Sequence, residues 1–322
     1  MHTFIASILT ARGSLRLDVG ASGDSVALKN MVELPGSTFR MGSDRFYPEE
    51  RPVREVAVEG FWIDRHPVTV AEFRRFVKAT GHVTWAEQAP EAADYPGAVP
   101  DDLVPGSLVF RKSEGPVDLR DFRNWWSWTP GADWRHPEGE GSNVGGRELH
   151  PVTHVSYADA GAYAAWAGKS LPTESEWEYA ARGGLDGATY TWGEEFAPKG
   201  RMMANTWQGE FPWQNLLADG YEGTSPVEQF PPNGFGLFDM AGNVWEWTVD
   251  DFAQPRQSVH MCCAPQREDQ DDRFPRKVIK GGSHLCAPNY CLRYRPAARQ
   301  AEAVDTTTCH IGFRCVVRPS SG

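Results

Sequence analysis

Two cysteines near the C-terminal end of the sequence, Cys286 and Cys291, have a spacing that suits metal chemistry. The C-x4-C interval is wider than the C-x2-C half of a usual zinc site, and no second Cys or His pair with ligand spacing is nearby. Two thiolates without further ligands suit Cu(I), a soft ion of low coordination number. Such a site keeps a position for a third sulfur, that of a substrate cysteine. The alternatives are a redox-inert disulfide and two buried core thiols.

Positive charge near this cysteine pair would change its chemistry. Arg293 and Arg295 follow the second cysteine closely, and they would lower the thiol pKa if their guanidinium groups faced the sulfurs. The remaining cysteines are expected to be inert, buried thiols. They are Cys262, Cys263, Cys309 and Cys315.

The composition excludes several classes of function. The 322 residues carry a net charge of −11, which argues against nucleic acid or an anionic membrane as a partner. No stretch approaches the ~18 uninterrupted apolar residues of a transmembrane helix. Residues 1–30 are interpreted as a leading segment, in part poorly ordered, because a short apolar run without preceding Lys or Arg is a poor secretory signal. The expected location is therefore the cytoplasm.

The pattern of apolar residues predicts short elements that would position these cysteines. Capping boxes predict helices that begin after Thr69 and Thr173 and end at Gly81 and Gly183, and a third helix follows Ser156 and ends at Gly168. Hairpin-like strands are predicted over 31–42 and 53–64, and single strands over 244–249, 277–281 and 312–317. Residues 87–146 are aperiodic and rich in Pro, Gly and Trp, as functional surface often is. One α+β domain is the simplest interpretation.

Several sequence blocks in this order resemble one known family. They are WAGKSLPTESEWEYAARGGL from residue 166, ANTWQGEFP from 204, PPNGFGLFDMAGNVWEWT from 231, KGGSHLCAPNYCLRYRPAAR from 280 and GFRC from 312. Together they make residues 31–318 similar to the formylglycine-generating enzymes, also called sulfatase-modifying factors. The resemblance implies one irregular domain over residues 31–322, with little regular secondary structure and related to C-type lectins.

The resemblance also implies a reaction. In this family Cu(I), held by the positions of Cys286 and Cys291, serves the oxidation by dioxygen of a cysteine to Cα-formylglycine. The substrate is an unfolded or nascent sulfatase chain with the motif C-x-P-x-R, and the enzyme is expected to act as a monomer. Ser283 would lie near the metal, although a local turn explains a serine after two glycines equally well. Aromatic positions that would line the pocket are Trp245, Tyr290, Trp125 and Trp126, the last two of which could equally fill a core.

Two loops match the family's structural calcium sites, where oxygen ligands are needed. One would use Asn205 and Asp219 side chains with the Thr206 and Tyr221 carbonyls. The other would use Asp239 and Glu246 side chains with backbone oxygens of Gly242 and Val244. Without the resemblance, both would be read as polar loops.

The chain also departs from the family pattern. Ala287 stands where many relatives have His, and residues 304–310 replace a stretch rich in Ser, Asn and Asp. Three positions of the vertebrate disulfide cysteines hold Ala164, Ala181 and Pro296, as a reducing cytoplasm would allow. A non-catalytic binding module of the same fold is the alternative function. An iron-dependent sulfoxide synthase is disfavoured, because its three-histidine site comes largely from a helical bundle for which residues 1–30 leave no room.

Overall fold

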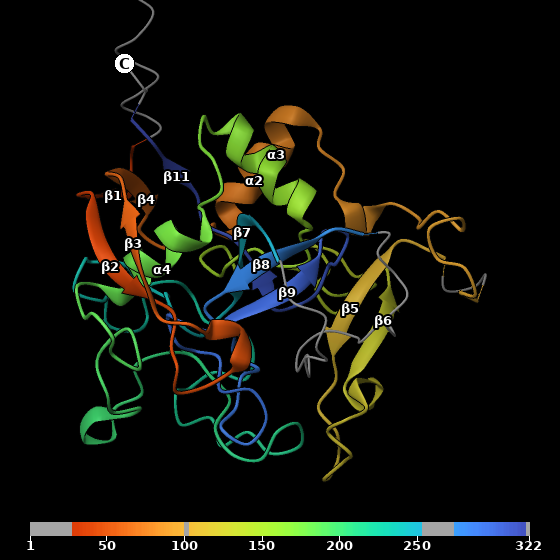
Figure 1. Cartoon of the computed structure of the whole chain (residues 1–322). Helices are drawn as coiled ribbons and strands as arrows, with labels where there is room; N and C mark the ends of the chain where they lie inside the picture. The colour runs from red at the N-terminus through yellow and green to blue at the C-terminus, as the bar shows by residue number, and fades with distance from the viewer. Residues whose placement is uncertain (1–27, 100–102, 253–273, 320–322) are drawn as a thin grey trace, which may run out of the picture.

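The fold is described by a computed structural model that covers residues 28–99, 103–252 and 274–319. Most of the leading segment 1–30, together with Cys262 and Cys263, lies outside the described residues. Within them, α-helices and strands are short and are joined by long irregular segments (Figure 1). The predicted α+β fold with little regular secondary structure is therefore confirmed.

The capping residues in the sequence predicted the start of all three helices and the end of two of them. Helix α2 (Val70–Thr80) follows the cap Thr69 and ends before Gly81, and helix α4 (Glu174–Arg182) follows Thr173 and ends before Gly183. Helix α3 (Tyr157–Trp166) follows Ser156 but ends slightly earlier than predicted, with Ala167 as its C-cap. The 3-10 helices are η1 (Pro48–Glu50), η2 (Trp85–Glu87), η4 (Phe122–Asn124) and η5 (Pro198–Gly200).

The two predicted N-terminal hairpins are wrong in their pairing. Strands β1 (Met31–Leu34) and β2 (Ser37–Met41) do not pair with each other but with β4 (Phe61–Asp64) and β3 (Arg54–Val58), respectively. The register is continuous, from Met31 opposite Asp64 to Met41 opposite Arg54, so the four strands form one antiparallel ribbon. The ladder is interrupted between Leu34 and Ser37, where Pro35 has no N–H to continue it.

A second sheet lies at the centre of the fold, below helices α2 and α3 in Figure 1. Its order is β10-β7-β8-β9, formed by Ile311–Gly312, Trp245–Asp251, Arg276–Lys280 and Arg299–Ala303. The strand predicted over 312–317 is wrong, because it divides into β10 and β11 (Val316–Val317), and β11 joins β4 in the other sheet. The hairpin of β5 (Gly106–Phe110) and β6 (Trp126–Pro130) arises in the stretch predicted to be aperiodic.

Three buried clusters fill the spaces between these elements. The largest joins α2 and α3 to β7 and contains Cys286, Cys291 and Cys315. The second packs α4 against the N-terminal ribbon, and the third gathers Trp125, Trp126, Trp207 and neighbours beside the β5–β6 hairpin. In the described part of the chain, no helix is long and apolar enough to cross a membrane.

Candidate active site

The structure brings the two sulfurs of the predicted thiol pair together. The Sγ atoms of Cys286 and Cys291 lie 3.0 Å apart, and both residues are fully buried. A disulfide bond is about 2.05 Å long, so these are two separate sulfurs. A tight turn makes the approach possible, because the N–H groups of Tyr290 and Cys291 both donate to the carbonyl of Ala287, at 3.1 and 2.7 Å. The arrangement offers two adjacent thiol ligands to one soft ion.

Ser283 lies in the turn that leads into the pair. Its backbone N–H lies 3.4 Å from the Cys286 sulfur, and its hydroxyl oxygen accepts from the N–H of Leu285 at 3.2 Å. The local turn is therefore present, and a role for the hydroxyl beside a metal stays a prediction. Gly282 (φ +70°) precedes it, and a Cβ there would come within 2.9 Å of the Arg293 backbone. Glycine thus lets the chain that follows the pair pass against the turn that precedes it.

Aromatic rings line the region next to the pair. Tyr290 stacks on Phe211 with ring centroids 4.6 Å apart, and Trp125 meets both rings edge-on. Trp245 is fully buried in the cluster that holds the two cysteines, and Trp126 lies with Trp125 in the adjoining cluster. The four predicted aromatic residues are thus all placed in the two clusters around the sulfurs.

Two aromatic residues of this region were missed by sequence reasoning. Trp207 donates its backbone N–H to the Cys286 carbonyl at 3.0 Å, and its ring contacts Phe211. Both belong to the block ANTWQGEFP, which was used for the resemblance but could have indicated the site. In the described residues, the buried indole N–H groups of Trp125, Trp126, Trp207 and Trp245 have no acceptor. Buried indole donors usually find one, so these four are exceptions to a general rule.

Three buried histidines also lie near the aromatic clusters and were not predicted. Burial lowers the pKa of His154 and of His284 to about 4, and it lowers that of His310 too. All three are therefore neutral at pH 7. His284 donates from Nδ1 to the Asn243 carbonyl at 2.8 Å, so its Nε2 carries the lone pair. His310 packs on Trp126, with ring centroids 4.9 Å apart.

The expectation that Arg293 and Arg295 would lower the thiol pKa stays a prediction, although the structure shows where their charges are paired. Arg293 and Arg295 are almost fully buried, but their guanidinium groups pair with Glu49 and Glu50. Their positive charge is balanced by these two carboxylates. No local sequence signal could show this, because the two glutamates lie far away in the sequence.

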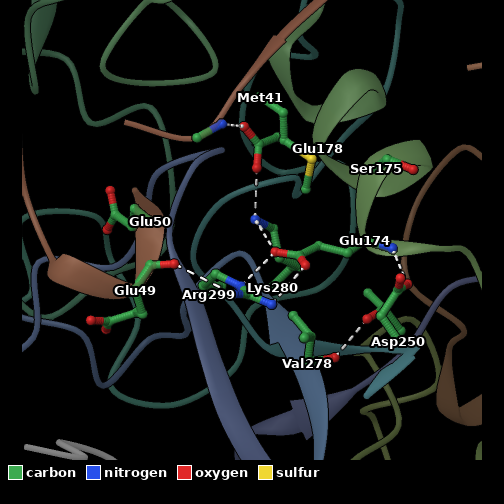
Figure 2. A network of polar contacts seen from close by, with 12 residues as sticks. Met41, Glu49, Glu50, Glu174, Ser175, Glu178, Asp250, Val278, Lys280 and Arg299 are labelled. Carbon is green, nitrogen blue, oxygen red and sulfur yellow. Dashed lines mark hydrogen bonds and ion pairs between the residues drawn. The ribbon is translucent and has the colours of Figure 1, made fainter. Parts of the chain in front are cut away.

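A buried charge network connects the strand after the pair with helix α4 (Figure 2). Lys280 of β8 lies 2.9 Å from the Glu178 carboxylate and 3.6 Å from that of Glu174. Arg299 of β9 binds Glu174 at 2.8 Å and donates to the Glu49 carbonyl at 3.4 Å. Charges this deeply buried are costly unless paired, so the network fixes how α4, β8, β9 and η1 meet.

The first predicted calcium loop has converging oxygens. Asp219 accepts at Oδ2 from the Thr206 N–H at 3.0 Å and from the Gln208 side-chain amide at 2.7 Å, and the same amide donates to the Thr206 carbonyl. Two of the four predicted ligands thus direct oxygens at one polar group, which suits a cation. Asn205 instead donates its amide to the Gly223 carbonyl, and Tyr221 donates its N–H to Asp219.

The second predicted loop fits a cation in part. Burial raises the pKa of Asp239 to about 6 despite its hydrogen bond from Glu228, so a cation beside it would be stabilising. Both carboxylate oxygens of Glu246, however, accept from Arg314, at 2.7 and 2.8 Å, and one also accepts from Trp177. That side chain is already paired. Within the described residues, no three His, Cys, Asp or Glu side chains form a group that could hold a metal, so any calcium here would depend on carbonyl and amide oxygens.

Comparisons with known proteins agree with this fold. Residues 20–319 match the family described as the sulfatase-modifying factor enzyme 1-like domain. A formylglycine-generating enzyme of Mycobacterium tuberculosis is 57% identical over 300 residues, covering 92% of this chain and 100% of that one. The solved structure of PvdO from Pseudomonas aeruginosa superposes with a TM-score of 0.57 at 27% identity, covering 89% of this chain and 93% of that one.

The relatives also include a protein named as inactive. The inactive C-alpha-formylglycine-generating enzyme 2 of Bos taurus is 39% identical over 318 residues, covering 97% of this chain and 93% of that one. Overall similarity therefore does not by itself decide activity, and the thiol pair has to be considered separately. Because the family model matches residues 20–319, almost the whole sequence, the chain belongs to the sulfatase-modifying factor family.

Proposed function

We propose that the chain converts the cysteine of a C-x-P-x-R motif in sulfatases to Cα-formylglycine, with dioxygen as oxidant and Cu(I) held by Cys286 and Cys291. The observation that carries the proposal is the 3.0 Å separation of two buried sulfurs that are not joined as a disulfide. Extensive identity with a named formylglycine-generating enzyme supports it. A non-catalytic module would have no need to keep two thiols in contact.

The residues around the pair suggest how a substrate would be held. When bound between the sulfurs, Cu(I) would supply a soft centre for a third thiolate and for dioxygen. Tyr290, Trp125 and Phe211 would shape the pocket and exclude water. The net charge of −11 would attract the arginine of the motif.

The proposed reaction of the substrate cysteine is an oxidation followed by a hydrolysis. The substrate cysteine loses one hydrogen from Cβ and the proton of its thiol, with two electrons in all, to reach the thioaldehyde level; dioxygen accepts these two electrons and two more from a thiol reductant and is reduced to water. Water then replaces sulfur as the aldehyde forms, and the sulfur leaves as sulfide. Reduced thiols are needed throughout, so a reducing compartment, which we propose is the cytoplasm, suits the protein. We also propose that calcium stabilises the fold at the Asn205–Asp219 loop.

Mass spectrometry of a C-x-P-x-R peptide tests the proposal. The peptide is incubated in air with copper-loaded protein and a thiol reductant, and the product is trapped with a hydroxylamine. We expect the mass change of cysteine to aldehyde and an oxime adduct. A peptide with Ser in place of Cys is the control. Unchanged peptide, from protein that binds Cu(I) at one equivalent, would favour the non-catalytic module instead.

A further inference from the structure

A segment far from the thiol pair in sequence packs against the residues that directly follow Cys291. Residues 46–50, which we call the clamp, include the 3-10 helix η1. The backbone N–H of Leu292 donates to the hydroxyl oxygen of Tyr47 at 3.1 Å. Because Leu292 is the next residue after Cys291, this bond constrains the direction in which the chain leaves the second sulfur.

The clamp also binds the two arginines beyond that point. Glu50 accepts from Arg295 with both carboxylate oxygens, at 2.9 and 2.5 Å, and Glu49 pairs with Arg293. All four side chains are no more than 2% exposed. A bidentate Arg–carboxylate pair fixes orientation as well as distance, and buried pairs of this kind cannot lose one partner without a large penalty.

Ring contacts complete the attachment. The Arg295 guanidinium lies 3.7 Å from the centroid of the Phe46 ring, and that of Arg293 lies 3.9 Å from the centroid of Tyr47. Arg295 in turn donates from Nε to the Leu292 carbonyl at 2.8 Å. Both the N–H and the C=O of Leu292 are therefore held, one by the clamp itself and the other by an arginine that the clamp binds.

The two cysteines are thus held by different parts of the chain. Trp207 and Ser283 hydrogen-bond the backbone of Cys286, whereas the stretch after Cys291 depends on the clamp. We propose that Tyr47 and Glu50 are positioning residues of the thiol pair, which keep the Cys291 sulfur beside that of Cys286 for a soft, thiol-binding ion. The identity of that ion as Cu(I) rests on the proposed function.

Tyr47→Phe is the sharpest test, because it removes the hydroxyl and keeps the ring beneath Arg293. Loss of an outer partner of a metal ligand typically weakens metal binding 10- to 100-fold. We expect a Cu(I) affinity about tenfold lower than wild type, measured by competition with a chelator of known affinity. Tyr179→Phe is the control, since the Tyr179 hydroxyl also makes a hydrogen bond to the backbone, donating to the Pro35 carbonyl at 3.0 Å, in a different core cluster.

The control separates positioning from general stability. Tyr179→Phe should bind Cu(I) as wild type does, even if both variants melt at a lower temperature. Glu50→Gln should weaken Cu(I) binding more than Tyr47→Phe, because it leaves the Arg295 charge unbalanced. If that variant does not fold, Tyr47→Phe alone decides. Wild-type affinity in Tyr47→Phe, or an equal loss in Tyr179→Phe, would overturn the inference.

A copper-independent measurement distinguishes failure of this inference from failure of the proposed function. Arsenite, an As(III) probe, binds neighbouring thiols and so reports on their spacing without any role for copper. If wild type binds no Cu(I), the proposed function fails and arsenite affinity then tests the clamp. A loss in Tyr47→Phe but not in Tyr179→Phe supports positioning by the clamp, and equal arsenite binding in all three proteins refutes it.

Discussion

Single residues decide the chemistry of the site, and the two clustered sulfurs can be compared with a third cysteine nearby. Cys315 is buried in the same core cluster as Cys286 and Cys291. Burial and the Asp64 carboxylate raise the pKa of its thiol, so it stays protonated and unreactive. The comparison separates the effect of losing any buried thiol from that of losing one member of the pair.

We predict that Cys286→Ser or Cys291→Ser abolishes conversion of a C-x-P-x-R peptide. A hydroxyl stays protonated at neutral pH and is a poor ligand for a soft ion, so one remaining thiolate cannot complete the site. Peptide mass spectrometry measures the loss, and circular dichroism checks the fold. Cys315→Ala should keep conversion and lose about 1 kcal/mol of stability. Conversion at the wild-type rate in either serine variant would disprove the assignment of the pair.

The spacing of Cys286 and Cys291 was weak evidence alone, and the resemblance selected the pair; in the structure one tight turn brings both sulfurs together. Spacing was insufficient for the arginines. Arg293 and Arg295 follow the pair closely, but the glutamates that balance them lie more than 240 positions away, at |i−j| of 244 and 245. Short-range spacing predicts a turn, whereas the partner of a buried charge depends on the whole fold.

Among the elements, strand β9 carries a buried carboxylate that the proposed reaction does not use. Glu302 is 3% exposed, and burial raises its pKa to about 7, with Asp305 adding to the rise and Thr306 and Arg276 opposing it. An acid whose pKa is raised in the folded state binds its proton more tightly there. Its contribution to stability is therefore fully present below the unfolded pKa of 4.5 and is lost as pH rises through 7.

We predict that Glu302→Gln removes this pH dependence. We compare the free energy of unfolding of the variant with that of wild type at each pH. Between pH 4.5 and pH 8 this difference should change in favour of the variant by about 3 kcal/mol at most, since each pKa unit corresponds to about 1.4 kcal/mol. Urea unfolding of both proteins at the two pH values gives the difference, from which other titrating groups cancel. Glu55→Gln, on the exposed side of β3, is the control and should show no such change. A pH-independent difference between Glu302→Gln and wild type would contradict the prediction.

The elements differ in how far local sequence determines them. Helices α2 and α4 were predicted closely because a capping box and a glycine define each end within the helix itself. The N-terminal strands were located but wrongly paired, because their partners depend on the packing of all four strands against α4. The β5–β6 hairpin was missed, although Trp126 and Trp128 alternate with Ser127 and Thr129 in β6, because the strands lie in a stretch rich in Pro and Gly that was interpreted as aperiodic.

At the scale of the whole molecule, one long segment has little regular structure of its own. Between helix α4 and strand β7, residues 183–244 contain η5 as their one regular element. Asn243 connects this segment to the thiol turn, since its carbonyl accepts from the N–H and from Nδ1 of His284, at 3.0 and 2.8 Å. Gly242 (φ +73°) permits a close contact within the segment, because a Cβ there would lie 2.2 Å from the Asn205 carbonyl, which accepts from the Asn243 N–H at 2.8 Å. The fold of this segment therefore affects the position of the thiol turn.

A calcium ion at the Asn205–Asp219 loop would tie this segment together, and its removal gives the last prediction. Binding at 100 times Kd contributes about 2.7 kcal/mol, so chelation with EGTA should lower the melting temperature by about 5 °C. Asp219→Asn should abolish the dependence on calcium, because it removes the carboxylate that approaches Thr206 and Gln208. Asp186→Asn, in the same segment but paired with Arg40 at the surface, should keep it. Identical melting curves with calcium and with EGTA would exclude the site. Residues 183–244 would then be held by their own hydrogen bonds, above all those of Asn243.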